Sequence, residues 1–276
     1  MRTKHRGVAV VLAMGVVALA AIAAAAMLAS QGTWSRRAEL TSEHVQAQAL
    51  AQAGVDWARA VLSDDRRSSG VDHLGEPWAL RLPPVPVDNG ELAGQIEDQQ
   101  GAFNLNNLLK NGAVSPPYVQ QFRRLLRILD LPDALADAYL AAGRPLIDAA
   151  ELATVPGFDE AVRARLRPFI TALPRFTAVN VNTASPEVLA TVIEGLDLDA
   201  ARELVAQRGR AYFRDRAEFL AQLPPGAVAG ANDVATGSDF FQASVRVTIG
   251  GAQARGTALL ARQGAGWPAV VWRKYP

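Results

Sequence analysis

The chain has 276 residues, 50% of them apolar, and its 28 basic and 27 acidic side chains leave a net charge of +1. This length allows a real hydrophobic core, and the near-neutral charge excludes a general electrostatic attraction to nucleic acid or anionic lipid. The absence of cysteine excludes a structural disulfide and a thiol nucleophile.

The chain begins with a basic segment, Met1–Gly7, followed directly by 22 uncharged residues, Val8–Ala29. As a helix, Val8–Ala29 is about 33 Å long, enough to cross a hydrocarbon core of roughly 30 Å. Basic residues hold the preceding segment in the cytoplasm, so everything after Ala29 is expected outside it. The sequence therefore predicts a bacterial envelope protein or a secreted one.

The apolar segment has an alternative interpretation. Ten of its 22 residues are alanine and small residues close it, which also fits a removable secretory signal ending near Ala29 or Ser30. No proline occurs from Met1 through Glu76, however, which favours an unbroken helix. Helical spacing continues at Leu50, Gly54, Trp57 and Val61. We expect one helix over 8–62, apolar all round at first and then amphipathic.

Extended segments are expected on both sides of a central stretch. Residues 63–77 are polar and predict a loop, 78–87 are rich in proline and fit an edge strand, and 92–98 fit a strand. From Phe241 apolar and polar residues alternate, with Ala243, Val245, Val247 and Ile249 on one face. Gly250–Gly251 predicts a hairpin to a strand over 252–262, and 268–274 fit a last strand.

The central stretch, residues 105–237, is predicted to be helical. Helices are expected from Pro116 to Leu129 and over 133–142, 148–154, 159–171, 186–194, 199–207 and 215–222. Ser185 is a candidate N-cap with Pro186 at the first helical position. The order of elements predicts an α+β fold in which a large all-helical domain is inserted into a small antiparallel sheet domain that follows a long N-terminal helix.

The leader resembles the class III signal of type IV pilins and type II secretion pseudopilins. In that family a prepilin peptidase cuts after the glycine, here Gly7, and methylates the next residue, here Val8. The fifth mature residue is usually Glu, which neutralises a neighbouring subunit's N-terminal amine, but here it is Leu12. A subunit without this carboxylate suits an end position, since a charge in the apolar filament core needs a partner.

Further motifs make the chain similar to the minor pseudopilin K family, which typically lacks this Glu. They are Trp78–Ala79, Gly94–Asn106 (GQIEDQQGAFNLN), Leu173–Pro174, Val179–Ala184 (VNVNTA) and Val271–Arg273. The resemblance implies a pseudopilin fold and a structural role at the tip of the type II secretion pseudopilus. It implies as partners other minor pseudopilins (I-like, J-like and H-like), the prepilin peptidase and the inner-membrane secretion platform. It implies a single-pass inner-membrane protein before assembly, with its C-terminal domain in the periplasm.

The expected domain organisation follows from the elements and the resemblance together. The leader is 1–7, the transmembrane half of the helix is 8–29, and its periplasmic half is 30–62. The sheet domain comprises 63–104 and 238–276, and the inserted helical domain is 105–237.

A DNA-binding function is the alternative. Val155–Asp159 and Ile193–Asp197 each lie between predicted helices and resemble helix-hairpin-helix modules, which bind DNA phosphates. Such hairpins use Gly-x-Gly, but the second glycine is replaced here by Asp159 and Asp197, which cap a helix and repel an anion. Residues 105–237 carry 14 basic and 15 acidic side chains. We therefore interpret the hairpins as packing modules and expect no nucleic acid partner.

No enzymatic function is predicted. The three histidines, His5, His44 and His73, lie far apart in the sequence, and Glu97–Asp98, an adjacent carboxylate pair on a strand, points to opposite sides. The sequence therefore predicts no catalytic residue and no metal ligand.

The family resemblance leaves calcium as a possible cofactor. An acidic insertion of many relatives is missing, and the acidic residues that remain, Asp130, Asp133, Asp137, Asp148 and Glu151, are explained by capping and solvated faces. We assign no ligands.

Overall fold

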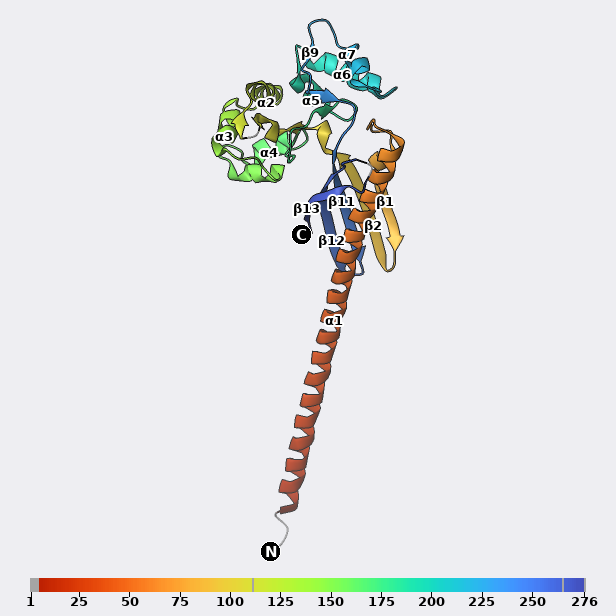
Figure 1. Ribbon diagram of the computed structural model, residues 1–276. Coiled ribbons are helices and arrows are strands. Elements are labelled where there is room, and N and C mark those ends of the chain that lie inside the picture. The colour runs from red at the N-terminus through yellow and green to blue at the C-terminus, as the bar shows by residue number, and fades with distance from the viewer. Residues whose placement is uncertain (1–4, 111, 265, 276) are drawn as a thin grey trace.

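The structure is a computed structural model that describes residues 5–110, 112–264 and 266–275. A single long helix carries a β-sheet along its C-terminal part, and a group of short helices lies beyond the sheet, at the far end from the N-terminus (Figure 1). The apolar half of the long helix extends away from the rest of the chain.

The long helix, α1, spans His5–Ser68. It is unbroken, as the absence of proline predicts, and ends at Ser68, beyond the expected end at Leu62. Arg66 and Arg67 in its last turn favour this extension, because cations stabilise the negative end of the helix dipole.

The sheet has five antiparallel strands in the order β1-β2-β11-β12-β13. Its strands are β1 (Leu82–Val87), β2 (Gly90–Asp98), β11 (Phe240–Ile249), β12 (Ala252–Ala261) and β13 (Ala269–Lys274). β1 is an edge strand, as its prolines predict, and Gly250 adopts φ 51° in the predicted hairpin. The chain leaves the sheet after β2 and returns in β11, so the intervening segment is an insertion, as predicted.

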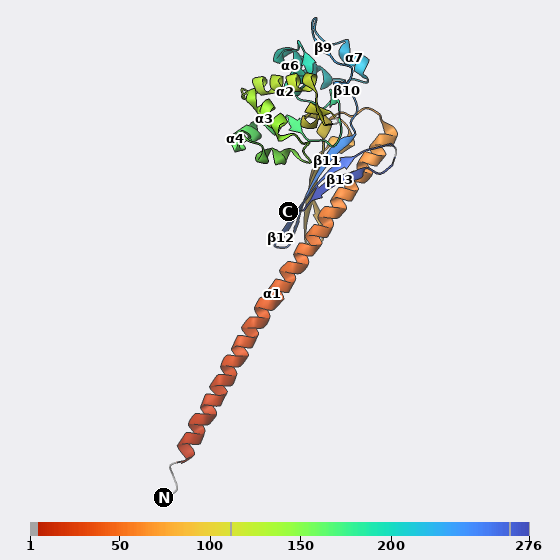
Figure 2. The same cartoon turned by 60° about the vertical axis from the view of Figure 1, so that its left-hand side comes forward.

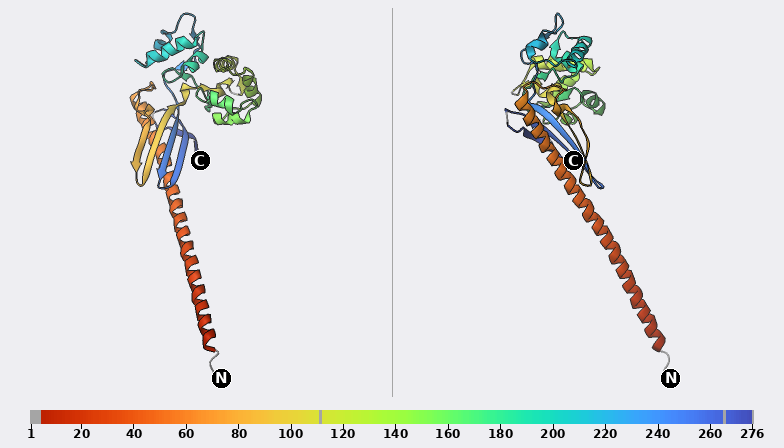
Figure 3. Two further views of the ribbon diagram at one scale, coloured as in Figure 1. Left: turned by 180° about the vertical axis from the view of Figure 1, so that it is seen from behind. Right: turned by 90° about the vertical axis from the view of Figure 1, so that its right-hand side faces the viewer.

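The sheet packs one face against the C-terminal half of α1 (Figure 3, right). Small residues on the helix, among them Ala47, Ala51 and Ala58, allow close contact with Ala243 and Ala258 of the sheet. The buried helical residues are Ala47, Ala51, Val55, Ala58 and Leu62, a series at helical spacing. Trp57, which the sequence pattern placed on the amphipathic face, is 54% exposed because this series, and not Trp57, points at the sheet.

The inserted segment has its own hydrophobic core, around Phe103, Phe122, Tyr139 and Leu189. Its α-helices are α2 (Pro116–Ile128), α3 (Ala134–Ala142), α4 (Glu160–Leu166), α5 (Pro186–Val192), α6 (Leu198–Arg208) and α7 (Arg216–Leu220). Its 3-10 helices are η3 (Leu105–Leu108) and η4 (Ala149–Thr154), and η1 (Pro77–Ala79) and η2 (Gln99–Gly101) precede it. Figure 2 shows these helices gathered above the end of the sheet.

Short strand pairs connect the inserted helices. They are β3 (Phe103–Asn104) with β6 (Ile170–Thr171), β4 (Leu109–Lys110) with β5 (Ala113–Val114), β7 (Val179–Asn180) with β10 (Val234–Ala235), and β8 (Ile193–Glu194) with β9 (Val228–Ala229). The helix predicted over 159–171 is therefore wrong beyond Leu166: Pro168 cannot continue it, and Ile170–Thr171 pairs with β3. The α-helix predicted over 148–154 is also wrong, because Ala149–Thr154 form the 3-10 helix η4, which Asp148 caps.

Three asparagines form the corner where the chain enters the insertion. Asn104 donates to the carbonyl of Arg175, and Asn107 donates to the carbonyl of Thr177. Asn106, 9% exposed, donates to two backbone carbonyls and accepts from the hydroxyl of Tyr139. The side-chain amides form hydrogen bonds with backbone groups that are not paired in a regular strand. These bonds hold the corner in one conformation.

Candidate functional site

The first half of α1 is a continuous apolar surface. Within the described chain, every side chain from Ala9 to Gln31 is exposed, and the helix is long and apolar enough to cross a membrane. Gly7 and Val8 lie near the start of α1, and the structure describes only their backbone. Leu12 follows one turn later and is 64% exposed.

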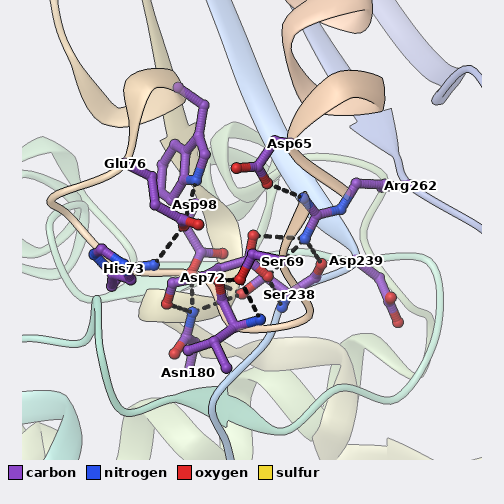
Figure 4. Close-up of polar contacts among 12 residues, drawn as sticks. Asp65, Ser69, Asp72, His73, Glu76, Asp98, Asn180, Ser238, Asp239 and Arg262 are labelled. Carbon is purple, nitrogen blue, oxygen red and sulfur yellow. Dashed lines mark hydrogen bonds and ion pairs between the residues drawn. The ribbon is translucent and has the colours of Figure 1, made fainter. Parts of the chain in front are cut away.

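A buried polar cluster joins the other end of α1 to the sheet and the insertion (Figure 4). At its centre is Arg262, which follows β12 and is 1% exposed. Its Nη1 lies 2.7 Å from Oδ2 of Asp65 in the last turns of α1, and its Nη2 lies 2.6 Å from Oδ2 of Asp72 in the loop after α1. Nη2 also donates to the carbonyl of Ser238, which precedes β11. One guanidinium thus links three segments.

Asp98, at the end of β2, is the second centre of the cluster. Its Oδ2 accepts hydrogen bonds from Asn180 Nδ2, Thr183 Oγ1 and Ser238 Oγ, and its Oδ1 accepts from the backbone N–H of Gln100. The last bond caps η2, whereas the side chain of the adjacent Glu97 is exposed. Asp98 therefore connects the sheet to the segment that leads into α5.

Burial shifts the acid–base properties of this cluster. It raises the pKa of Asp65 to about 6, with Glu76 and Asp72 raising it further and Arg262 opposing. Burial also raises the pKa of Asp98, against its hydrogen bonds from Thr183 and Ser238. The carboxylates of Asp65, Asp72 and Glu76 lie within 4.8 Å of one another, and one guanidinium pairs with only two of them, so the cluster favours retention of a proton on Asp65.

The acidic part of the cluster does not fit a calcium ion. Ligand oxygens of Asp65, Asp72 and Glu76 lie within 4.8 Å of one another. Arg262 already neutralises the first two, and Glu76 accepts from the indole N–H of Trp78. Calcium requires six to eight oxygens, which these groups do not leave free.

Of the 15 acidic residues in the insertion, the five considered as calcium ligands do not fit the ion either. Each contacts a basic side chain, the pairs being Asp130 with Arg165, Asp133 with Arg127, Asp137 with Arg123, Asp148 with Lys274, and Glu151 with Arg144.

The chain, including the inserted segment next to this cluster, is similar to proteins of one known family. Two family models, both described as type II secretion system protein K, match residues 101–175 and 179–237. Over 91% of its length, the chain is 37% identical to the type II secretion system protein K of Pseudomonas aeruginosa, covering 86% of that protein. The protein of Klebsiella pneumoniae is 31% identical over 100% of this chain and 98% of its own length. The chain belongs to the type II secretion system protein K family.

The fold agrees with this assignment. A chain in the crystal structure of the GspK–GspI–GspJ complex from the enterotoxigenic Escherichia coli type 2 secretion system matches 87% of this chain and 99% of itself, with a TM-score of 0.76 and 23% identity. The expected family is therefore confirmed, and so is the α+β architecture of a long helix, an antiparallel sheet and an inserted helical region. Protein K is a structural component of the secretion system.

Each of the two predicted glycine turns precedes an α-helix, but the turn at Gly157 follows the 3-10 helix η4 and the turn at Gly195 follows the short strand β8. Gly157 (φ 88°) lies between η4 and α4, and Gly195 (φ 77°) lies before α6. Asp159 accepts from the N–H of Val162, and Asp197 accepts from the N–H of Ala200. Each carboxylate therefore caps the helix N-terminus at which a DNA phosphate would have to bind, as the sequence predicted.

His44 bonds Gln48 on the exposed surface of α1, and His73 stacks on the ring of Tyr212 at 3.9 Å. Sequence reasoning missed Asp65, Asp72 and Arg262, which have no local pattern. Asn180 was within a quoted family motif, and its role is to donate to Asp98, to Ser238 and to the carbonyl of Asp72.

Proposed function

We propose that this protein K is a structural minor pseudopilin at the tip of the type II secretion pseudopilus. It supports protein export across the outer membrane by assembling with I-like, J-like and H-like minor pseudopilins and has no catalytic activity. The observation that carries this proposal is the arrangement in Figure 3 (left): the exposed apolar helix lies at one end of the molecule and the bulky helical insertion at the other. A subunit bearing this insertion above its sheet leaves no room for another subunit to be added beyond it.

Leu12 supports an end position. A filament-core subunit is expected to offer a carboxylate here to the N-terminal amine of a neighbour, and this chain has no Asp, Glu, Lys or Arg between Arg6 and Arg36. An amine buried without a counter-charge costs several kcal/mol. The chain is therefore suited to a place where no further subunit presents an amine to it.

The helix also defines the proposed location and processing. Before assembly the chain spans the inner membrane once through 8–29, with its C-terminal domain in the periplasm. The prepilin peptidase removes Met1–Gly7 and methylates Val8, and the inner-membrane secretion platform then incorporates the subunit. The E. coli relative assembles with GspI and GspJ, which supports an I-like and a J-like partner along α1.

We also propose that the domains follow the sequence-based division, with the sheet domain at 63–104 and 238–276 and the inserted domain at 105–237. In this division the two glycine turns are helix-hairpin-helix units that pack the insertion. DNA binding is not favoured, because Asp159 and Asp197 occupy the helix N-termini.

Mass spectrometry of the mature protein tests the proposal. We expect an N-terminus at methylated Val8 and co-purification with the I-like and J-like subunits of the same system. An N-terminus near Ala29 or Ser30 identifies an ordinary secreted protein and contradicts the tip assignment. A gel shift with the full-length chain in detergent at low salt is expected to show no DNA binding.

A further inference from the structure

Two arginines follow the apolar half of α1. Arg36 and Arg37 are exposed, and neither forms an ion pair with a carboxylate in the described ranges of the chain. They are the first charged side chains after Arg6. Trp34, just before them, is 75% exposed. An indole and two unpaired guanidinium groups therefore lie side by side in the sequence where the apolar segment ends.

The sheet leaves this part of α1 uncovered. Its turn at Gly250–Gly251 is fixed to α1 at Glu43, whose carboxylate accepts the N–H of Gly251. Glu43 lies about 9 Å beyond Arg37 along the helix, and in Figure 1 the lower part of α1 extends past the sheet. The basic residues of the sheet lie beyond the turn, so Arg36 and Arg37 are the arginines nearest to the outer end of the apolar segment.

The unbroken helix determines the height of these residues above a membrane that 8–29 spans. Along the axis, Trp34 lies about 8 Å beyond Ala29, and Arg36 and Arg37 lie about 11 Å beyond it. The headgroup region on each side of a bilayer is about 5–8 Å thick. Helical side chains lean toward the N-terminus, here toward the bilayer, so the long arginine side chains reach the phosphates. Trp34 lies in the headgroup region, where tryptophan is enriched.

Removal of the leader makes these arginines the main charge near the membrane. Met1–Gly7 holds the other three basic side chains of this region. After the proposed cleavage, the amine of Val8 is the only charged group before Arg36. Attraction to an anionic lipid surface is worth about fivefold in binding per arginine and falls off within a Debye length of about 8 Å. Glu39, the acidic residue that follows, lies farther from the membrane.

We propose that Arg36 and Arg37 bind the phosphate groups of anionic phospholipids in the outer leaflet of the inner membrane, with Trp34 in the headgroup region. This contact holds the mature subunit at a fixed depth until the secretion platform extracts it. The contact is local, since a chain with a net charge of +1 has no general attraction to anionic lipid. The inference rests on the proposed function, because it takes 8–29 as an inner-membrane span.

Quenching of tryptophan fluorescence by brominated phospholipids tests the contact in the full-length chain reconstituted in bilayers. Bromine quenches an indole only at close range, and Trp57, the next tryptophan, lies about 35 Å beyond Trp34 along α1. Quenching therefore reports on Trp34, and Trp34→Phe is expected to abolish it. In mixtures of phosphatidylglycerol and phosphatidylcholine, one lipid is brominated at a time, at the same mole fraction.

We expect brominated phosphatidylglycerol to be preferred over brominated phosphatidylcholine next to Trp34 by about fivefold or more at low salt. The preference is expected to fall at 1 M salt, where the Debye length is about 3 Å. Arg36→Gln combined with Arg37→Gln is expected to make the two lipids quench equally. Arg246→Gln combined with Arg255→Gln, a matched pair of exposed arginines on the sheet, keeps the wild-type preference.

Three results would overturn the inference. Equal quenching by the two lipids in the wild type, or an unchanged preference in the Arg36 and Arg37 double variant, overturns it and leaves the proposed function standing. Equal quenching together with weaker co-purification of that variant with the I-like and J-like subunits identifies an acidic segment of a partner as the occupant. If neither lipid quenches Trp34, the helix does not span the bilayer, and both the inference and the proposed function fail.

Discussion

Arg262 Nη2 lies 2.6 Å from Asp72 Oδ2, and each of these side chains is only 1% exposed. Arg262 follows β12 near the C-terminus, whereas Asp72 follows α1. The pair therefore closes the sheet onto the end of the long helix. Because Arg262 also contacts Asp65 and the carbonyl of Ser238, its loss leaves several buried acceptors without a partner.

Arg262→Leu is therefore expected to destabilise the protein by about 3–5 kcal/mol, the usual effect of removing one partner of a buried ion pair. Thermal unfolding of the full-length protein in detergent measures this. Arg255→Leu, at an exposed position on β12, the strand that Arg262 follows, is the matched control and is expected to change the free energy of unfolding by less than about 0.5 kcal/mol. If both variants lower the free energy of unfolding equally, the ion pairs of Arg262 with Asp65 and Asp72 make no specific contribution to stability.

Stability is expected to depend on pH through Asp65. Burial raises its pKa from 3.8 to about 6 in the folded protein, so the folded state binds this proton more tightly than the unfolded state does. Its contribution is fully present below pH 3.8 and is lost as the pH rises through about 6. The raised pKa of Asp98 acts in the same direction, whereas the lowered pKa of His73 removes stability as the pH falls through 6.5.

Comparing variants isolates the Asp65 contribution. Asp65→Asn is expected to lose less stability than the wild type between about pH 4 and pH 7, measured by chemical denaturation at several pH values. Asp64→Asn, whose side chain is 81% exposed, keeps the wild-type profile. Parallel profiles for wild type and Asp65→Asn would rule out this carboxyl as the source.

The spacing between α1 and the sheet depends on Gly54. A Cβ added there lies 2.8 Å from a methyl group of Val245, a distance that requires the helix or the sheet to move. Gly54→Ala is expected to cost about 1–3 kcal/mol relative to Gly15→Ala. Both replacements remove a glycine from α1 and gain similar helix propensity, but a Cβ at Gly15 has nothing within 4 Å. Equal melting temperatures of the two variants would show that the close contact between Gly54 and Val245 does not require a glycine.

Leu12→Glu tests the apolar position near the start of α1. A carboxylate without a partner in the hydrocarbon region costs about 3 kcal/mol. We expect this variant to co-purify less with the I-like and J-like subunits, and Leu12→Met to behave as the wild type does. Unchanged assembly of Leu12→Glu would mean that the position meets a cation and would contradict an end location.

Several elements were predictable because their signal is local. The proline-free run predicted α1, alternation predicted β11, and the prolines in β1 predicted an edge strand. The helix over 159–171 was predicted too long, since the pairing of Ile170 with Phe103 brings together segments 67 residues apart (170 − 103).

The sequence by itself determined the apolar helix, the order of strands and helices, and the family resemblance, because helical and strand periodicities act between residues a few positions apart. Only the tertiary structure decided which polar residues meet at the base of the insertion. Arg262 pairs with Asp65 and Asp72 across 197 and 190 residues. The burial that makes such pairs strong arises only after α1, the sheet and the insertion have packed together, and no local pattern encodes it.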